Sequence, residues 1–342
     1  MKAWIAVSVL LLVILGIVAL LCLKKAPLAV RVLILPKFEF GEVADDAPGE
    51  AYYYYKKYCA GGDEYEIKGG YPGSKLYMKD GVALYVTGMG KVNAALSLAA
   101  VLNDSRFDFS HAYLISTGCA GSAVGYGTMG DVFLITAAVD YDLGYKADIR
   151  DLADSSSKTT WFHSEDFDSS AYMPLNSDLM DRIYALIKDI PLETTKKTHA
   201  FMKAAFDGAK WASRRPAVLR GTTVTSDSYW KGEYSHQNAL LVTETYGCKD
   251  PYATTEMEDV ALAATAKRFG LLDRFIILRD SVNTDCFMNG ETPESLWDPE
   301  YPVHLTPEES AEFLDIFPVA MKNNFTVGRV VIDAILDGTL NG

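Results

Sequence analysis

The chain has 342 residues, of which 49% are hydrophobic and 12% aromatic, so it can bury a sizeable core in one large domain or two. Its 45 acidic residues outnumber the 32 basic ones and give a formal net charge of −13. No run of lysine or arginine is longer than a pair. Composition and charge therefore argue against a disordered chain and against a protein that binds nucleic acid.

An apolar run without any charge occupies residues 3–23 and has about the length of a helix that crosses a bilayer. Lys2 precedes the run, Lys24 follows it, and the end of the run has no clear small-residue cleavage pattern. We expect residues 1–28 to be a membrane anchor or a cleaved signal peptide. Residues 29–342 are then one domain that is secreted or membrane-anchored outside the cytosol. A single span cannot enclose a pore.

From residue 28 onward, strand and helix signals alternate without a linker, which predicts one α/β domain. We expect strands at residues 30–35, 82–87, 112–116, 132–138, 222–225 and 274–278. We expect helices at residues 91–102, 177–188, 256–269 and 327–336. The acidic, aperiodic stretch 140–174 is interpreted as an excursion over a site. Four cysteines follow the apolar run without C-x-x-C spacing, and one or two disulfides are compatible with them.

A glycine-rich connection follows the strand at residues 112–116. It contains Gly118, Gly121, Gly125, Gly127 and Gly130. Because glycine has no Cβ and accepts a positive φ, backbone N–H groups here can approach a ligand closely. We expect a small polar ligand at these strand ends, and the alternative is a simple turn. The connection has no room for a crossover helix, so a mixed sheet is predicted.

A second glycine loop, T-G-M-G-K-V-N at residues 87–93, follows one strand and opens a helix. It contains Gly88 and Gly90, but Asn93 stands where a dinucleotide-binding loop has its third glycine. The acidic residue about twenty positions later, Asp108, precedes a strand instead of following one. The loop therefore predicts a ligand other than NAD.

Two further segments carry acidic and amide side chains. Thr255 and Glu258 have the spacing of a capping box, and the alternative is that Glu258 binds two vicinal hydroxyls. Asp280, Asn283 and Asp285 follow a predicted strand, where open α/β sheets bind ligands, although an Asx-rich turn has the same composition.

Two adjacent aromatic residues, Tyr229 and Trp230, end the segment that follows the strand at residues 222–225. Their flat rings would stack on a planar base, and the alternative is that they belong to the core. Tyr229 and Trp230 are the last of the segments that we use to infer the class of ligand.

Taken in order, these segments resemble the nucleoside phosphorylase and nucleosidase superfamily, and more closely the purine nucleoside permease family. The resemblance rests on P-K-F-E-F-G-E at 36–42, T-G-x-G-K-V-N at 87–93, T-G-x-A-G…G-D-V at 117–132, S-D-x-[FY] at 226–229, E-M-E-D at 256–259 and R-x-x-x-[DN] at 279–283. It implies a three-layer αβα fold with a central mixed twisted sheet, preceded by one N-terminal apolar helix.

The resemblance also implies a purine nucleoside as the ligand. The implied substrate-binding residues are Gly88, Gly90, Thr117, Gly118, Tyr229, Trp230, Met257 and Glu258. Among them, Met257 and Glu258 would hold the ribose and Tyr229 would stack on the base, while Asn283 would hydrogen-bond the purine. Relatives in the superfamily often complete their sites with a neighbouring subunit, so a homo-oligomer is compatible with the chain.

Two departures from the superfamily bear on the reaction. Asn283 stands where nucleosidases have the aspartic acid that protonates the leaving base, and an amide cannot deliver a proton. Asp280 or Asp285 is the substitute acid if the loop is shifted. Ser116 stands where hexameric phosphorylases have an arginine for phosphate, which a dianion normally requires.

The sequence therefore predicts cleavage of the N-glycosidic bond of a purine nucleoside. Hydrolysis is favoured, with Glu39 or Glu42 as the base that activates water, and phosphate stays a candidate co-substrate. The alternative is a non-catalytic nucleoside-binding protein that takes part in transmembrane transport, and a third reading is a fold without activity. The histidines are scattered without metal-ligand spacing, so we expect neither a metal nor an organic cofactor.

Overall fold

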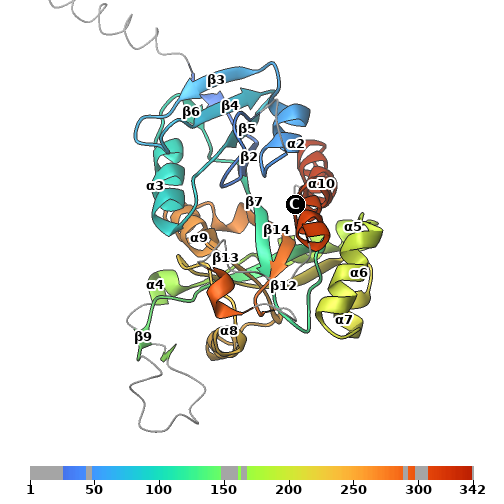
Figure 1. Cartoon of the computed structure of the whole chain (residues 1–342). Helices are drawn as coiled ribbons and strands as arrows, with labels where there is room; N and C mark the ends of the chain where they lie inside the picture. Colours follow the sequence, from blue (N-terminus) through green and yellow to red (C-terminus); the bar gives the residue numbers. More distant parts are fainter. Residues whose placement is uncertain are drawn as a thin grey trace, which may run out of the picture.

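A mixed β-sheet runs through the middle of the domain, with helices on two sides of it (Figure 1). The computed structural model describes residues 26–43, 48–147, 161–162, 168–287, 292–296 and 307–340. The apolar run at 3–23 and much of the stretch 140–174 lie outside these ranges. Among the helices within the ranges, none combines the length and apolar character that a membrane span needs.

Ten strands form this sheet, in the order β11-β8-β12-β13-β7-β2-β5-β4-β3, and β14 pairs with both β7 and β8. Their bounds are β2 Val32–Leu35, β3 Asp63–Glu66, β4 Lys75–Lys79, β5 Val82–Tyr85, β7 Tyr113–Ser122, β8 Val132–Asp140, β11 Tyr172–Pro174, β12 Val218–Thr225, β13 Tyr252–Glu256 and β14 Phe275–Thr284. The sheet contains both parallel and antiparallel pairs, so the predicted mixed α/β fold is confirmed.

Five of these strands pair in a closed ring. β7 pairs with β13, β13 with β12, β12 with β8, β8 with β14, and β14 returns to β7. The ring contains two register shifts, one between Gly221 and Thr222 and one between Ser281 and Asn283. Such irregularities bend strands and therefore help the ring to close. The ring closes this half of the central sheet on itself, so the sheet curves more strongly here than an open twisted sheet does.

Two neighbouring strands of the ring, β7 and β14, are longer than predicted. β7 continues through Gly118 and Gly121. β14 continues through its polar residues to Thr284, and every residue of β14 is buried. The two strands pair in parallel from Phe275 opposite Leu114 to Thr284 opposite Ser122. The ladder satisfies the backbone of both, so the predicted end of this strand at residue 278 is wrong, and the Asx-rich turn that the sequence left as an alternative is not formed.

Helices cover both sides of the sheet. α3 (Lys91–Leu102) and α9 (Asp259–Arg268) lie on one side, and α5 (Ser177–Ile187) and α10 (Pro307–Leu336) on the other (Figure 1). α3 has the predicted bounds, and α10 begins twenty residues before its predicted start. The side-chain oxygen of Asn176 accepts the backbone N–H of Leu179 and starts α5.

The remaining elements complete the described chain. They are α2 Tyr52–Tyr54, a π-helix Tyr55–Cys59, α4 Asp168–Ala171, α6 Lys196–Ala205, α7 Lys210–Ser213, α8 Glu233–Thr245, 3₁₀-helices Leu272–Arg274 and Pro293–Leu296, and the strand pairs β1 Leu28–Ala29 with β6 Phe107–Asp108 and β9 Tyr145–Lys146 with β10 Trp161–Phe162. The four cysteines after the apolar run are free, so the disulfides that the sequence allowed are not formed.

Candidate active site

A cavity of about 180 Å³ opens where β7, β13 and β14 carry polar residues in succession. Its charged lining residues are Lys37, Glu50, Glu256, Glu258 and Arg279. Its apolar and amide lining includes Phe38, Met89, Trp230, Met257, Val282, Asn283 and Phe317. Of the predicted substrate-binding residues, Tyr229, Trp230, Met257 and Glu258 line this one cavity, together with Asn283.

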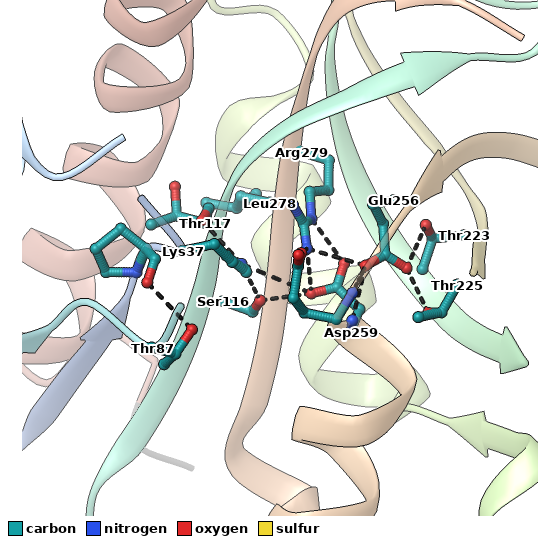
Figure 2. A network of polar contacts seen from close by, with 12 residues as sticks. Lys37, Thr87, Ser116, Thr117, Thr223, Thr225, Glu256, Asp259, Leu278 and Arg279 are labelled. Carbon is teal, nitrogen blue, oxygen red and sulfur yellow. Dashed lines mark hydrogen bonds and ion pairs between the residues drawn. The ribbon is translucent and has the colours of Figure 1, made fainter. Parts of the chain in front are cut away.

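Arg279 is the centre of the charged floor and is 1% exposed. Its Nη2 donates to Glu256 Oε2 and to Glu258 Oε2, each at 3.0 Å. Its Nε donates to Asp259 Oδ2 at 2.8 Å, and its Nη1 donates to a backbone carbonyl of β7. Figure 2 shows this guanidinium between the carboxylates of Glu256 and Asp259. Each nitrogen of the guanidinium therefore donates to a protein acceptor.

Lys37 is the second buried cation of the floor. Its Nζ donates to Ser116 Oγ at 2.6 Å and to the carbonyl of Thr117 at 2.8 Å, and lies 3.8 Å from Asp259 Oδ1 (Figure 2). Burial, followed by the neighbouring charge of Arg279, lowers the pKa of the ammonium group. The N–H groups of both buried cations at the cavity thus donate to other groups of the protein.

Glu256 fixes the start of α9. Its Oε2 accepts the backbone N–H groups of Glu258 and Asp259, both at 2.7 Å, and its other oxygen accepts from Thr223 and Thr225. Burial raises the pKa of this carboxyl to about 7, and the nearby Asp259 adds to the effect. The capping box of Thr255 and Glu258, one of the two alternatives that the sequence left open, is not formed, because Thr255 lies in β13 and Glu256 supplies the capping oxygen.

Glu258 joins two segments that are 168 residues apart in the sequence. Its Oε1 accepts the backbone N–H of Gly90 at 3.0 Å, and its Oε2 accepts from Arg279. Gly90 has φ +86°, a conformation that favours glycine, and this turns its N–H toward the carboxylate. The loop at residues 87–93 and the E-M-E-D segment therefore meet at the cavity.

Glu50 is a cavity carboxylate that the sequence did not single out. Its Oε2 accepts the backbone N–H of Lys37 at 2.6 Å, and its Oε1 accepts that of Cys119 at 2.9 Å. Burial raises the pKa of the carboxyl above its usual range. It lies on Gly118, where a Cβ would come within 2.5 Å of both carboxylate oxygens. Glu50 stands in a loop without a motif, so no local signal could have found it.

The opposite end of the cavity is aromatic and amide in character. Asn283 Nδ2 donates to the hydroxyl of Tyr229 at 2.6 Å. Trp230 stacks on Tyr141 with ring centroids 5.1 Å apart. Asn283 Oδ1 and Trp230 Nε1 are buried, and neither has a hydrogen-bond partner among the described residues. One acceptor and one donor on cavity-lining residues are thus available to a ligand.

The predicted catalytic acids lie elsewhere. Glu39 accepts the backbone N–H groups of Ala51 and Tyr52 at 2.9 and 2.7 Å beside a neighbouring cavity, and burial raises its pKa to about 7. Glu42 is exposed in the loop that follows. Asp280 is fully buried in β14, where its Oδ1 lies 3.5 Å from Asn324 Nδ2 of α10.

The remaining predicted site residues shape the cavity from behind. Thr117 donates its hydroxyl to Asn324 Oδ1 at 2.5 Å, under the floor. Gly88 leaves room for the ring of Tyr71, which a Cβ would meet at 2.4 Å. Asp285, the second substitute acid, accepts from His236 Nδ1 at 2.7 Å and from the Tyr252 hydroxyl at 2.8 Å. These contacts support the cavity walls.

The model of the family described as purine nucleoside permease matches residues 29–339. The chain belongs to this family. The resemblance seen in the sequence is therefore confirmed. A probable purine nucleoside permease of Schizosaccharomyces pombe is 28% identical over 238 residues, which is 63% of this chain and 68% of that protein. A purine nucleoside permease of Candida albicans is 26% identical over 56% of this chain, and the match spans about half of its own length, 52%.

Solved structures show that this family member shares its fold with nucleosidases. The 5′-methylthioadenosine/S-adenosylhomocysteine nucleosidase of Neisseria meningitidis, in complex with methylthio-immucillin-A, matches with a TM-score of 0.53 and 15% identity over 89% of this chain and 99% of that one. The futalosine hydrolase of Helicobacter pylori matches with a TM-score of 0.54 and 13% identity over 89% of this chain and 97% of that one.

Proposed function

We propose that the cavity binds a purine nucleoside and hydrolyses its N-glycosidic bond. The observation that carries this proposal is the charge arrangement of the floor. Four buried acids, Glu50, Glu256, Glu258 and Asp259, surround only two cations, both of which are paired within the protein. Such a floor favours the positive charge that develops on a ribosyl group as the bond to its base breaks.

The same arrangement disfavours phosphate as the attacking group. A phosphate dianion needs a free guanidinium or ammonium group, and the donors of Arg279 and Lys37 are already taken by carboxylate, hydroxyl and carbonyl oxygens. Several carboxylates around the cavity would repel the dianion in addition. Water, which is neutral, meets neither obstacle.

Cavity residues support the binding of the ribose, the activation of water and the departure of the base. Glu258 accepts hydrogen bonds from the ribose hydroxyls, since within the described residues Oε1 accepts from Gly90 and Oε2 from Arg279, and each oxygen keeps a second lone pair. Glu50 takes a proton from a water molecule, whose oxygen bonds to C1′. The C1′–N bond breaks, its electron pair leaves with the base, and the base acquires a proton from solvent. Asn283 hydrogen-bonds the departing base but supplies no proton.

The lack of a proton donor at Asn283 favours a second candidate function, that of a nucleoside-binding protein that takes part in transport. Binding without catalysis needs no general acid, and an amide at position 283 suffices for it. The relatives are named permeases, which agrees with this candidate. The transport candidate also agrees with our expectation that the domain lies outside the cytosol, where residues 1–28 anchor it or act as its signal peptide.

Base release from intact nucleosides separates these functions. The purified full chain is incubated with adenosine and inosine, with and without inorganic phosphate, and the free base is quantified. We expect release without phosphate, and no release by Glu258→Gln, with exposed Glu244→Gln as the matched control. Release that requires phosphate would identify a phosphorylase. Calorimetric binding without any release would leave the transport function.

A further inference from the structure

We propose that His236, Asp285 and Cys286 form a binding site for one zinc ion, at the junction of α8 with the end of β14. None of these three residues lines the nucleoside cavity. The site is therefore separate from the cavity, and the inference stands apart from the proposed function.

Three different ligand types converge at this junction. His236 lies in the first turn of α8, whereas Asp285 and Cys286 directly follow β14. One ring nitrogen, one carboxylate oxygen and the cysteine Sγ lie within 4.8 Å of one another, and all three residues are buried. Imidazole nitrogen, carboxylate oxygen and thiolate sulfur are the ligands that zinc takes in proteins. His236 stands 49 residues before Asp285, which is why the sequence showed no ligand spacing.

The distances suit a tetrahedral ion after a small adjustment. Zinc bonds of about 2.0–2.3 Å in a tetrahedron put neighbouring ligand atoms roughly 3.3–3.8 Å apart. His236 Nδ1 and Asp285 Oδ2 now lie 2.7 Å apart, joined by the ring proton. Zinc takes the place of this proton and of the Cys286 thiol proton, and the ligand atoms shift by on the order of 1 Å.

The charges of the ligands balance those of the ion. A thiolate, a carboxylate and a neutral imidazole together carry two negative charges, which one zinc ion neutralises. The loaded site then buries no net charge, which removes the main cost of placing ionised groups in the interior.

The Asp285 carboxylate is held in place by further hydrogen bonds. Its Oδ1 accepts the backbone N–H of Val124 at 2.9 Å, and its Oδ2 accepts from the Tyr252 hydroxyl at 2.8 Å. The backbone carbonyl of Asp285 accepts the N–H of Gly232 at 2.8 Å and so joins the start of α8 to the end of β14. Hydrogen bonds of this kind orient metal ligands and raise the affinity of the site.

Glu233 supplies a fourth oxygen from the same helix. It precedes His236 by three residues, so both side chains lie on one face of α8. Its Oε1 accepts from Gln237 at 2.9 Å. Either this exposed carboxylate or a water molecule completes the tetrahedron.

A zinc ion at this junction fastens α8 to the end of β14. Trp230 stands three residues before the start of α8, and Asn283 stands two residues before Asp285. Both Trp230 and Asn283 line the nucleoside cavity. The proposed ion is thus structural, and it steadies the aromatic and amide end of the cavity without touching a ligand there.

The test uses the purified full chain after removal of metal with a chelator. Cobalt(II) is the probe, because a cobalt–thiolate bond gives a charge-transfer band in the near ultraviolet, and zinc should then displace it. We expect one equivalent of cobalt to produce the band. Cys286→Ser should lose the band and bind zinc at least about a hundredfold more weakly, since even outer contacts of a zinc site contribute tenfold to a hundredfold. Cys248→Ser, which removes another free thiol, should keep the band.

Thermal unfolding of the same proteins distinguishes a lost ligand from a lost fold. Zinc should raise the Tm of the wild type and of Cys248→Ser, and leave that of Cys286→Ser unchanged. Tyr252→Phe keeps all three ligands and removes only a hydroxyl that orients Asp285, so zinc should bind about tenfold more weakly.

A wild type without the cobalt–thiolate band, or an unchanged zinc affinity in Cys286→Ser, would overturn the site. If Cys286→Ser does not fold, Tyr252→Phe decides, and an unchanged zinc affinity there overturns it as well. Neither result touches base release or nucleoside binding, so the proposed function is tested independently.

Discussion

Glu50 shows how one side chain is prepared for proton transfer by its surroundings. Two backbone N–H groups hold its carboxylate at the cavity, and its closest contacts include no cation. Burial raises the pKa of the carboxyl, against the lowering effect of the Lys37 and Arg279 charges, and so makes it a stronger base. A carboxylate in water would be a weaker base, so position and burial together suit Glu50 to activate water.

Glu50→Gln should lower the rate of base release by about 10²- to 10⁴-fold and change nucleoside affinity much less, because the amide keeps the size of the side chain and accepts one of the two N–H donors with its oxygen but takes no proton. In the wild type the rate should rise with pH through the raised pKa of Glu50, since only the ionised form is a base. Steady-state kinetics between pH 4.5 and 9 checks both. An equal loss in exposed Glu244→Gln would contradict the assignment.

Asn283→Asp tests the missing general acid at the same scale. A protonated carboxyl at this position would deliver a proton to the leaving base, so the rate should increase, by up to about 10²-fold. The gain should disappear at alkaline pH, where the new carboxyl is ionised. The Tyr229 hydroxyl can rotate to donate to the carboxylate, which preserves the contact. A rate that stays unchanged across the pH range would show that proton delivery does not limit the reaction.

Elements position these residues through pairing and close backbone contact. The glycines of β7 are the clearest case, because the sequence predicted them to be a turn and the structure has Gly118 and Gly121 inside the strand. Gly118 provides the surface for Glu50, and Gly121 leaves the space beside Asn283. Their missing side chains, more than any freedom to turn, are what the cavity needs.

Gly118→Ala should therefore reduce base release strongly, since the added methyl group would displace the Glu50 carboxylate. The residue also has φ +149°, which alanine rarely adopts, so stability should fall as well. Gly125→Ala separates the two effects, because φ there is +87° but no atom lies within 4 Å of the added Cβ. Thermal unfolding and kinetics are measured on both. Full activity in Gly118→Ala would exclude the proposed support of Glu50.

The sequence predicted elements whose signal is local and missed features that depend on pairing. α3 was predicted with its observed bounds because its alanine-rich run and the glycines before it form a continuous pattern. The predicted strand ended at residue 278, well before the end of β14, because the polar second half of β14 has the composition of a loop. Only the ladders to β7 and β8 bury this half. α10 was truncated because it contains Pro318, which usually ends a helix.

The site was predictable to a similar degree. Glu258, Met257 and Tyr229 belong to motifs and were found through the resemblance, and they line the cavity. Glu50 belongs to none, and the chain brings it to the floor only because the loop before α2 folds back over β7. The ring of strands has no local signal either, since it arises from pairing between segments far apart in sequence.

At the scale of the whole molecule, burying acids makes stability depend on pH. Glu39, Glu256 and Asp280 each have a pKa raised to about 7, chiefly by burial. The folded chain then holds protons that the unfolded chain releases at much lower pH. Between the two pKa values the folded state binds more protons, so these groups lower the free energy of unfolding as pH rises.

Asp280 offers the sharpest test, because its Oδ2 is buried without a partner in the described chain. Asp280→Asn cannot ionise, so its free energy of unfolding should exceed that of the wild type by more at pH 8 than at pH 5.5, with a difference on the order of 2 kcal/mol. Urea denaturation at the two pH values measures it, with exposed Asp273→Asn as the control. A gap that stays constant with pH would mean that the Asp280 carboxyl has the same protonation in both states, and that the charge of the buried floor does not set the pH limit of the fold.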